Sequence, residues 1–209
     1  METLLKYAVI ASFLFAAVSL TILVLKTFSF GKKELYAEPR GSVKKGIVYA
    51  FGKGMMPWEK ESAGNHLPTY IGGVLYHGGV FLSIAYLITV IVPIEIPAAL
   101  LFIFQVFCGV GIVTGLGLLV KRYSKAHMRA LSVPDDAVAN ILVDIFMIAA
   151  FLHTLFPAVT PYFFPAAIVM FLYMPFGKIR HCFFFFYVRI LFGTFYGRRG
   201  VFPQKPRVT

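Results

Sequence analysis

Long stretches without a charged side chain limit how this sequence of 209 residues can fold. Residues 7–25, 67–94 and 96–120 are uncharged runs of 19, 28 and 25 residues, and residues 137–177 form a run of 41 broken only by Asp144. A helix needs about 20 apolar residues to cross a bilayer. The composition, 59% hydrophobic and only 14% charged, excludes a soluble enzyme and a nucleic-acid partner despite the net charge of +11.

The last run must hold two helices, because 41 residues rising about 1.5 Å each far exceed a bilayer core about 30 Å thick. Pro157 and Pro161 place the break between them, and Pro165 marks the start of the second helix. The sequence therefore predicts an all-α integral membrane protein, a five-transmembrane-helix bundle forming one domain over 1–209. The predicted spans are 5–27, 68–92, 97–120, 136–156 and 162–180, followed by a tail over 181–209.

Lysine and arginine occur in alternate connections between these spans. Eight lie between Lys26 and Lys60, four between Lys121 and Arg129, and seven from Lys178 onward, whereas the connections at 93–97 and 157–161 have none. By the positive-inside rule the N-terminus is outside, and the basic loops and the tail are cytoplasmic. We expect a multi-pass protein of a prokaryotic cytoplasmic membrane, whose basic loops can also contact acidic lipid or protein.

Ionisable groups inside a membrane are costly, so each one there is a functional candidate. His77 lies in the cytoplasmic half of the second span, and neighbouring glycines such as Gly78 leave room for a flat macrocycle. His181 closes the fifth span in the same leaflet, as the second axial ligand of one b-type haem would have to. Lys178 and Arg180 are candidates to pair with the haem propionates.

The remaining candidates are less specific. Gly111 and Gly115 of the third span make room either for a porphyrin or for close helix packing. His153 and Asp144 share the fourth span, but nine residues put them on opposite faces of the helix, so they are not expected to pair. His66 is placed at the water interface, and a solvated side chain is the favoured interpretation for it.

Three segments resemble the gamma subunit of respiratory nitrate reductase and its relatives, including the cytochrome subunits of heterodisulfide-reductase-type complexes. They are Leu75-Tyr-His77, Gly115-Leu-Gly-Leu-Leu-Val-Lys121-Arg122 and Pro175-Phe-Gly-Lys-Ile-Arg-His181. Each motif is weak alone, but their order and leaflet match the family. Members of the nitrate reductase type hold two stacked b haems between their second and fifth helices.

The sequence departs from the family pattern where the outer haem would be bound. Leu87 and Phe163 stand where the resemblance leads us to expect the two outer histidines. An outer haem would need His153 with an unusual partner such as Met147. The ligand supply therefore favours one haem, held by His77 and His181, over two.

The resemblance implies a membrane-anchoring cytochrome b subunit that relays electrons between a quinone and a cytoplasmic iron-sulfur subunit. The reaction of any soluble substrate would take place on another chain. If quinone chemistry occurs here, His153, Asp144 or His66 would have to handle its protons. Two alternatives stay open: a haem-free membrane anchor or scaffold of an enzyme complex, and a small transporter using Asp144 and His153.

Overall fold

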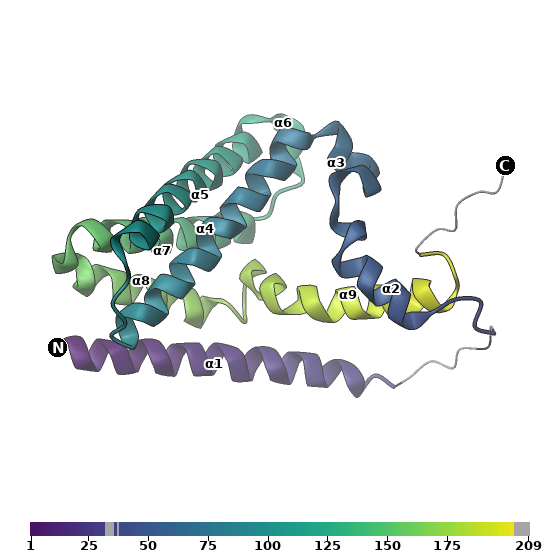
Figure 1. The fold of residues 1–209 in the computed structure, drawn as a ribbon, viewed down its shortest axis with the longest axis horizontal. Helices are drawn as coiled ribbons and strands as arrows, with labels where there is room; N and C mark the ends of the chain where they lie inside the picture. Colours follow the sequence, from purple (N-terminus) through teal and green to yellow (C-terminus); the bar gives the residue numbers. More distant parts are fainter. Residues whose placement is uncertain (32–35, 37, 203–209) are drawn as a thin grey trace. The chain divides into compact units, whose positions relative to one another are not determined.

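A computed structural model describes residues 1–31, 36 and 38–202, and every regular element within them is helical (Figure 1). The four longest helices are α1 (Glu2–Phe28), α4 (Leu67–Ile91), α5 (Ala98–Ser124) and α7 (Pro134–Leu155). The shorter ones are α2 (Val43–Phe51), α3 (Glu61–Asn65), α6 (Ala126–Ala130), α8 (Thr160–Tyr173) and α9 (His181–Arg198). Single 3₁₀ turns are η1 (Lys53–Met55), η2 (Pro57–Glu59), η3 (Pro157–Val159) and η4 (Lys178–Arg180).

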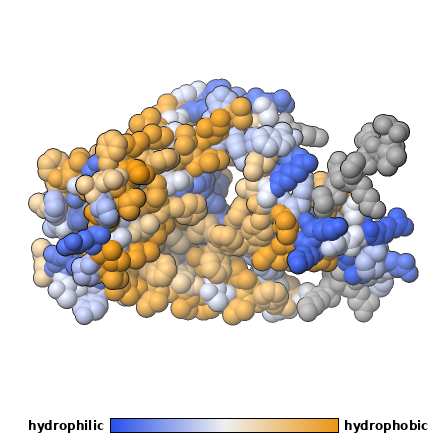
Figure 2. Space-filling view, in the orientation of Figure 1, coloured by the Kyte–Doolittle hydropathy of each residue, from blue (hydrophilic) through white to orange (hydrophobic). Residues whose placement is uncertain are grey.

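The all-helical, membrane-spanning class predicted from the sequence is confirmed. Helices α1, α4, α5 and α7 are each long and apolar enough to cross a membrane, and they begin and end within four residues of the predicted spans. Large apolar side chains point outward from them, such as Phe102 and Val113 of α5, which are 66% and 71% exposed. Figure 2 shows this apolar covering over the helices of the bundle. A surface of this kind is suited to lipid.

The predicted fifth span over 162–180 begins within two residues of α8 but extends past its end, and a fifth crossing would need Pro157–Tyr173 together with Lys178–Arg198, which follow each other through a bend. Helix α8 begins at Thr160 and ends at Tyr173, so its 14 residues are too few to cross a bilayer alone. Pro175 has no N–H to continue the helical hydrogen bonds, and the chain turns through 174–177 before η4 and α9. Pro165, expected to mark the start of this helix, lies inside α8.

The chain divides into two compact units. The first, here called the bundle unit, comprises Met1–Val18 and Pro68–Ile179. The second, here called the tail unit, comprises the described residues of Ser19–Leu67 and Arg180–Thr209. Helix α1 contributes residues to both units.

The core of the bundle unit lies along α7, which packs against α5 and α8. Its fully buried side chains include Phe146, Met147 and Ala150 of α7 and Phe163, Phe164 and Ala167 of α8. Helices α4 and α5 meet at two glycines: a Cβ added to Gly111 would lie 2.9 Å from the Cα of Gly79. Small residues of this kind let membrane helices approach closely.

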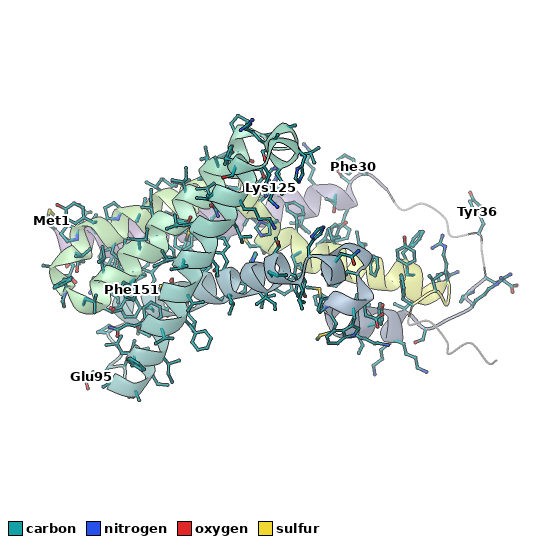
Figure 3. The ribbon with its side chains drawn as sticks, turned by 90° about the horizontal axis from the view of Figure 1, so that it is seen from above. Met1, Phe30, Tyr36, Glu95, Lys125 and Phe151 are labelled. Atoms are coloured by element: carbon teal, nitrogen blue, oxygen red, sulfur yellow. The ribbon has the colours of Figure 1, made fainter. Side chains whose placement is uncertain are left out.

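Charge is distributed unevenly along the bundle unit. The end formed by the α5–α6 turn carries four of its basic residues, Lys121, Arg122, Lys125 and Arg129. Glu95 lies at the other end of α5, in a connection with no lysine or arginine (Figure 3). Asp136, in the first turn of α7, accepts hydrogen bonds from Lys178 and from the backbone N–H of Val133, and pairs with Arg122 at 3.4 Å.

The tail unit is built on the packing of α2 against α9. Glycines form this contact: a Cβ added to Gly46 would lie 2.2 Å from the carbonyl oxygen of Gly193, and one on Gly197 would lie 2.7 Å from the carbonyl oxygen of Ser42. The backbone N–H groups of Arg40 and Gly41 both donate to the carbonyl of Arg198, at 2.9 and 3.0 Å. The two segments therefore touch backbone to backbone.

The loop after α2 is fixed by a small polar cluster. Tyr49 donates a hydrogen bond to Glu59 at 2.8 Å, and Lys53 pairs with the other oxygen of that carboxylate at 3.1 Å. The hydrogen bond from Tyr49, followed by that from Lys53, lowers the pKa of Glu59 below its ordinary value. Trp58, in the same loop, is 72% exposed.

Candidate functional site in the bundle unit

His77 is exposed on the outer face of α4. Its Nδ1 lies 2.6 Å from the carbonyl oxygen of Gly73, one turn earlier in the helix. Because a carbonyl only accepts, Nδ1 must carry the hydrogen, and in the neutral ring Nε2 then carries the lone pair. Iron-ligating histidines are commonly oriented in this way, by a hydrogen bond from the nitrogen that does not bind the metal.

Three glycines near His77 on α4 have open space beside them. A Cβ added to Gly72, Gly73 or Gly78 would meet no atom within 4 Å. Gly78, the glycine that follows His77, thus lies in open space. The ring of Tyr76 contacts His77 edge to face, with centroids 5.9 Å apart. Of the three glycines, Gly73 lies one turn from His77 on the same side of the helix, whereas Gly72 and Gly78 lie on other sides.

The glycines of α5 have a different surrounding. Gly111 faces Gly79 across the α4–α5 contact, and Gly115 faces Tyr76 and Asp144, with a Cβ placed 2.4 Å from the Tyr76 ring. Both glycines therefore serve helix packing, which was one of the two interpretations left open by the sequence. Unlike Gly78, neither has open space beside it.

Two of the other residues predicted for the haem, His181 and Arg180, belong to a different unit from His77. His181, the first residue of α9, is exposed and belongs to the tail unit, as does Arg180. Lys178 belongs to the bundle unit and donates to Asp136. Within the described part of the chain, no group of three or more histidine, cysteine or acidic side chains is placed to hold a metal ion.

A hydrogen-bonded chain surrounds His153 near the end of α7. Thr160 donates to the carbonyl of Pro157 at 2.7 Å, so its oxygen accepts from Nε2 of His153 at 3.0 Å. The Tyr86 hydroxyl then donates to Nδ1, at 2.8 Å. Both ring nitrogens of His153 are therefore hydrogen-bonded. Sequence reasoning singled out His153 but missed Tyr86, whose partner is 67 residues away.

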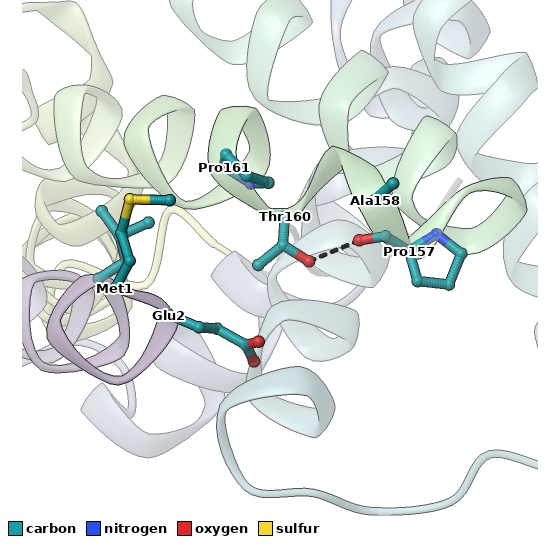
Figure 4. Close-up of a pocket in the computed structure, with 7 residues that line it drawn as sticks. Met1, Glu2, Pro157, Ala158, Thr160 and Pro161 are labelled. Atoms are coloured by element: carbon teal, nitrogen blue, oxygen red, sulfur yellow. Dashed lines mark hydrogen bonds between the residues drawn. The ribbon is translucent and has the colours of Figure 1, made fainter.

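The hydrogen-bonded series from Tyr86 through His153 to Thr160 ends at a small pocket. The pocket has a volume of about 280 Å³ and is bordered by the beginning of α1 and by the α7–α8 connection (Figure 4). Its lining residues are Met1, Glu2, Leu5, Pro157, Ala158, Thr160 and Pro161. Thr160 both lines the pocket and bonds His153, so it connects the pocket with a buried imidazole.

The outer half of the bundle does not fit a second haem. Phe163 and Leu87, which stand where the resemblance places histidines, are 0% and 1% exposed. Phe163 packs against His153, with ring centroids 5.1 Å apart, and stacks on Phe146 at 5.9 Å. His153 has no ring nitrogen to spare, and Met147, the other candidate ligand, is fully buried beside Gly79. Packed side chains fill the space that a porphyrin would need.

Asp144 lies in a second cluster, separate from His153 as their spacing on α7 predicts. Its carboxyl group is 3% exposed, and it borders Gly115 of α5 beside the ring of Tyr76. The Tyr76 hydroxyl accepts from the side-chain amide of Asn140 at 3.1 Å and donates to the backbone carbonyl of the same residue at 3.4 Å. Asn140 lies one turn before Asp144 on α7, a spacing that sequence reasoning overlooked, whereas Tyr76 is 64 residues from Asn140 and could not be found from local spacing.

His66, the third proton candidate, follows α3 in the tail unit. Its side chain is exposed, in agreement with the solvated interpretation.

Comparisons of this chain with protein-family models, with curated proteins and with solved structures find no match. The likeness to the nitrate reductase gamma subunit therefore remains a prediction from the three sequence motifs.

Proposed function

We propose that this chain is a membrane-anchoring b-type cytochrome subunit, which relays electrons between a membrane quinone and a cytoplasmic iron-sulfur subunit. The observation that carries the proposal is the state of His77. Its side chain is exposed, its Nδ1 is bound to the carbonyl of Gly73, and a Cβ added to Gly73 or Gly78 would meet no atom within 4 Å. A structural histidine would more often be enclosed by its neighbours.

When bound, a haem would supply one-electron transfer. The chain's own part is to present Nε2 of His77, to orient the ring through Gly73, and to leave open space at Gly73 and Gly78. His181 remains the sequence prediction for the second ligand. The filled outer half of the bundle favours one haem over two.

The proposed quinone and partner follow from the resemblance and from charge. The His153 chain and its pocket lie at the α7–α8 connection, which has no basic residue, so the positive-inside rule puts them on the outer side. The same rule puts the basic α5–α6 turn in the cytoplasm of a prokaryotic cell, where an acidic iron-sulfur subunit or acidic lipid would meet it.

The rival function is a haem-free membrane anchor. The tail unit favours it, because Lys44, Lys45 and Arg198 lie on or next to the α2–α9 pair, where they can hold an acidic enzyme without any cofactor.

Replacement of His77 by alanine distinguishes the cytochrome subunit from the haem-free anchor. We expect purified, detergent-solubilised chain to show a b-type reduced-minus-oxidised spectrum with one haem per chain by pyridine haemochrome. His77→Ala and His181→Ala should each abolish it, because an axial bond is lost. His127→Ala, which changes a histidine of the short helix α6, should keep the full haem content. Full haem content in His77→Ala would contradict the ligand assignment. An assembled wild-type complex without haem would overturn the cytochrome proposal and support the haem-free membrane anchor.

A further inference from the structure

The carboxyl group of Asp144 is buried in the bundle unit, and the one donor that faces it among the described residues is the neutral Tyr76 hydroxyl. Neither of its oxygens has a partner among the described residues, and the same is true of the side-chain oxygen of Asn140, one turn earlier on α7. Residues four apart face the same side of a helix. Three buried acceptor oxygens thus gather on one helix face, and the single Tyr76 hydroxyl cannot satisfy all of them.

A bare carboxylate at this position would be expensive, because both burial and the surrounding membrane disfavour an uncompensated charge. The neighbouring elements supply no cation. Helix α8 contains no lysine, arginine, histidine or acid, and α5 presents Gly115 to the carboxyl group. Lys121 and Arg122, in the last turns of α5, bond to Thr69 and to Asp136 instead. The titratable group that faces Asp144 from α4 is Tyr76, a neutral phenol.

The space beside the carboxyl group distinguishes a proton from a metal ion. A single carbon added to Gly115 would come within 2.5 Å of Oδ1 of Asp144 and 2.4 Å of the Tyr76 ring. A sodium ion with its ligands needs more room than one carbon atom. A proton needs none, and it turns one of the carboxyl oxygens into the missing donor.

We infer that Asp144, together with Asn140 and Tyr76, forms a proton-binding site inside the bundle. The protonated carboxyl donates to the side-chain oxygen of Asn140, and the Asn140 amide remains bound to the Tyr76 hydroxyl. One proton thus accounts for two of the three oxygens, and the third faces the Tyr76 hydroxyl. Tyr76 also contacts His77, so the site would hold its proton close to the electron relay; this last link alone rests on the proposed function.

Infrared spectroscopy of the chain in lipid vesicles without haem tests the site independently of the electron relay. At neutral pH we expect a protonated carboxyl C=O band that shifts in heavy water and also shifts when aspartate is labelled with carbon-13 in its side chain. The band should be absent in Asp144→Asn and unchanged in Glu95→Gln, which alters an exposed loop carboxylate. Asn140→Leu should move it to higher frequency, because the acceptor is lost.

The isotope label makes the test valid on the wild type, even where Asp144→Asn fails to fold, because Asp136 is paired with Lys178 and Arg122 and Asp135 accepts a hydrogen bond from Tyr173. Absence of an aspartic acid band at neutral pH would overturn the proposal. So would a band that sodium chloride removes and choline chloride leaves, since this would assign the site to a metal cation.

Discussion

Replacement of Gly46 by alanine is expected to lower the free energy of unfolding by about 3 kcal/mol, at the upper end of the usual cost of overpacking. The added Cβ would lie 2.2 Å from the Gly193 carbonyl oxygen and 2.5 Å from the Cα of Gly197, and backbone atoms cannot rotate away as a side chain can. Helices α2 and α9 would have to separate, losing the contact that holds the tail unit together.

The expected loss of stability in Gly46→Ala is informative because it is opposite to the usual effect of this substitution. Glycine to alanine within a helix normally stabilises by up to about 1 kcal/mol, because the backbone of alanine has less freedom to lose. Gly117→Ala provides the matched control, because a Cβ on Gly117 of α5 meets nothing within 4 Å. Unfolding in sodium dodecyl sulfate, followed by the emission of Trp58, the single tryptophan, would measure both. Equal stability of the two variants would contradict the close packing of α2 on α9.

The long helices could be predicted from the sequence because a span is a local property. The lengths of the uncharged runs fixed α1, α4, α5 and α7 to within a few residues, since charged side chains and prolines end a membrane helix wherever they fall. The end of α8 at Tyr173 was predicted seven residues too late, at 180, for a related reason. The apolar run continues to Gly177, but Pro175 interrupts the helical hydrogen bonds before the run of apolar residues ends.

The sites could be predicted only in part, because they depend on contacts between distant residues. His77, His153 and Asp144 stand out as ionisable residues in apolar surroundings. Nothing local identifies Tyr86 as the partner of His153, or Tyr76 as a neighbour of Asp144. The spacing of Gly193 and Gly197, four residues apart, was a readable signal of close helix packing, and it anticipates the contact of α9 with α2.

Truncation of Phe163 to alanine is expected to cost about 3–5 kcal/mol, the usual range for a large buried aromatic side chain. Phe163 is 0% exposed and is the shared member of an aromatic cluster. Its ring lies 5.9 Å from those of Phe146 and Phe164, 6.0 Å from that of Tyr86, and 5.1 Å from the imidazole of His153. Aromatic pairs of this kind contribute beyond the area that they bury.

Tyr162, the preceding residue of α8, is the matched control, because its side chain is 74% exposed and Tyr162→Ala should change stability by less than about 0.5 kcal/mol. Thermal unfolding of both variants in one detergent would give the comparison. A further variant, Phe163→His, restores the residue type that the resemblance expects at this position. If that variant gained a second haem without loss of stability, the outer half of the bundle would have room for a porphyrin, and Phe163 would be a lost ligand position. If it lost stability and bound no additional haem, the aromatic cluster would be what fills this half of the bundle.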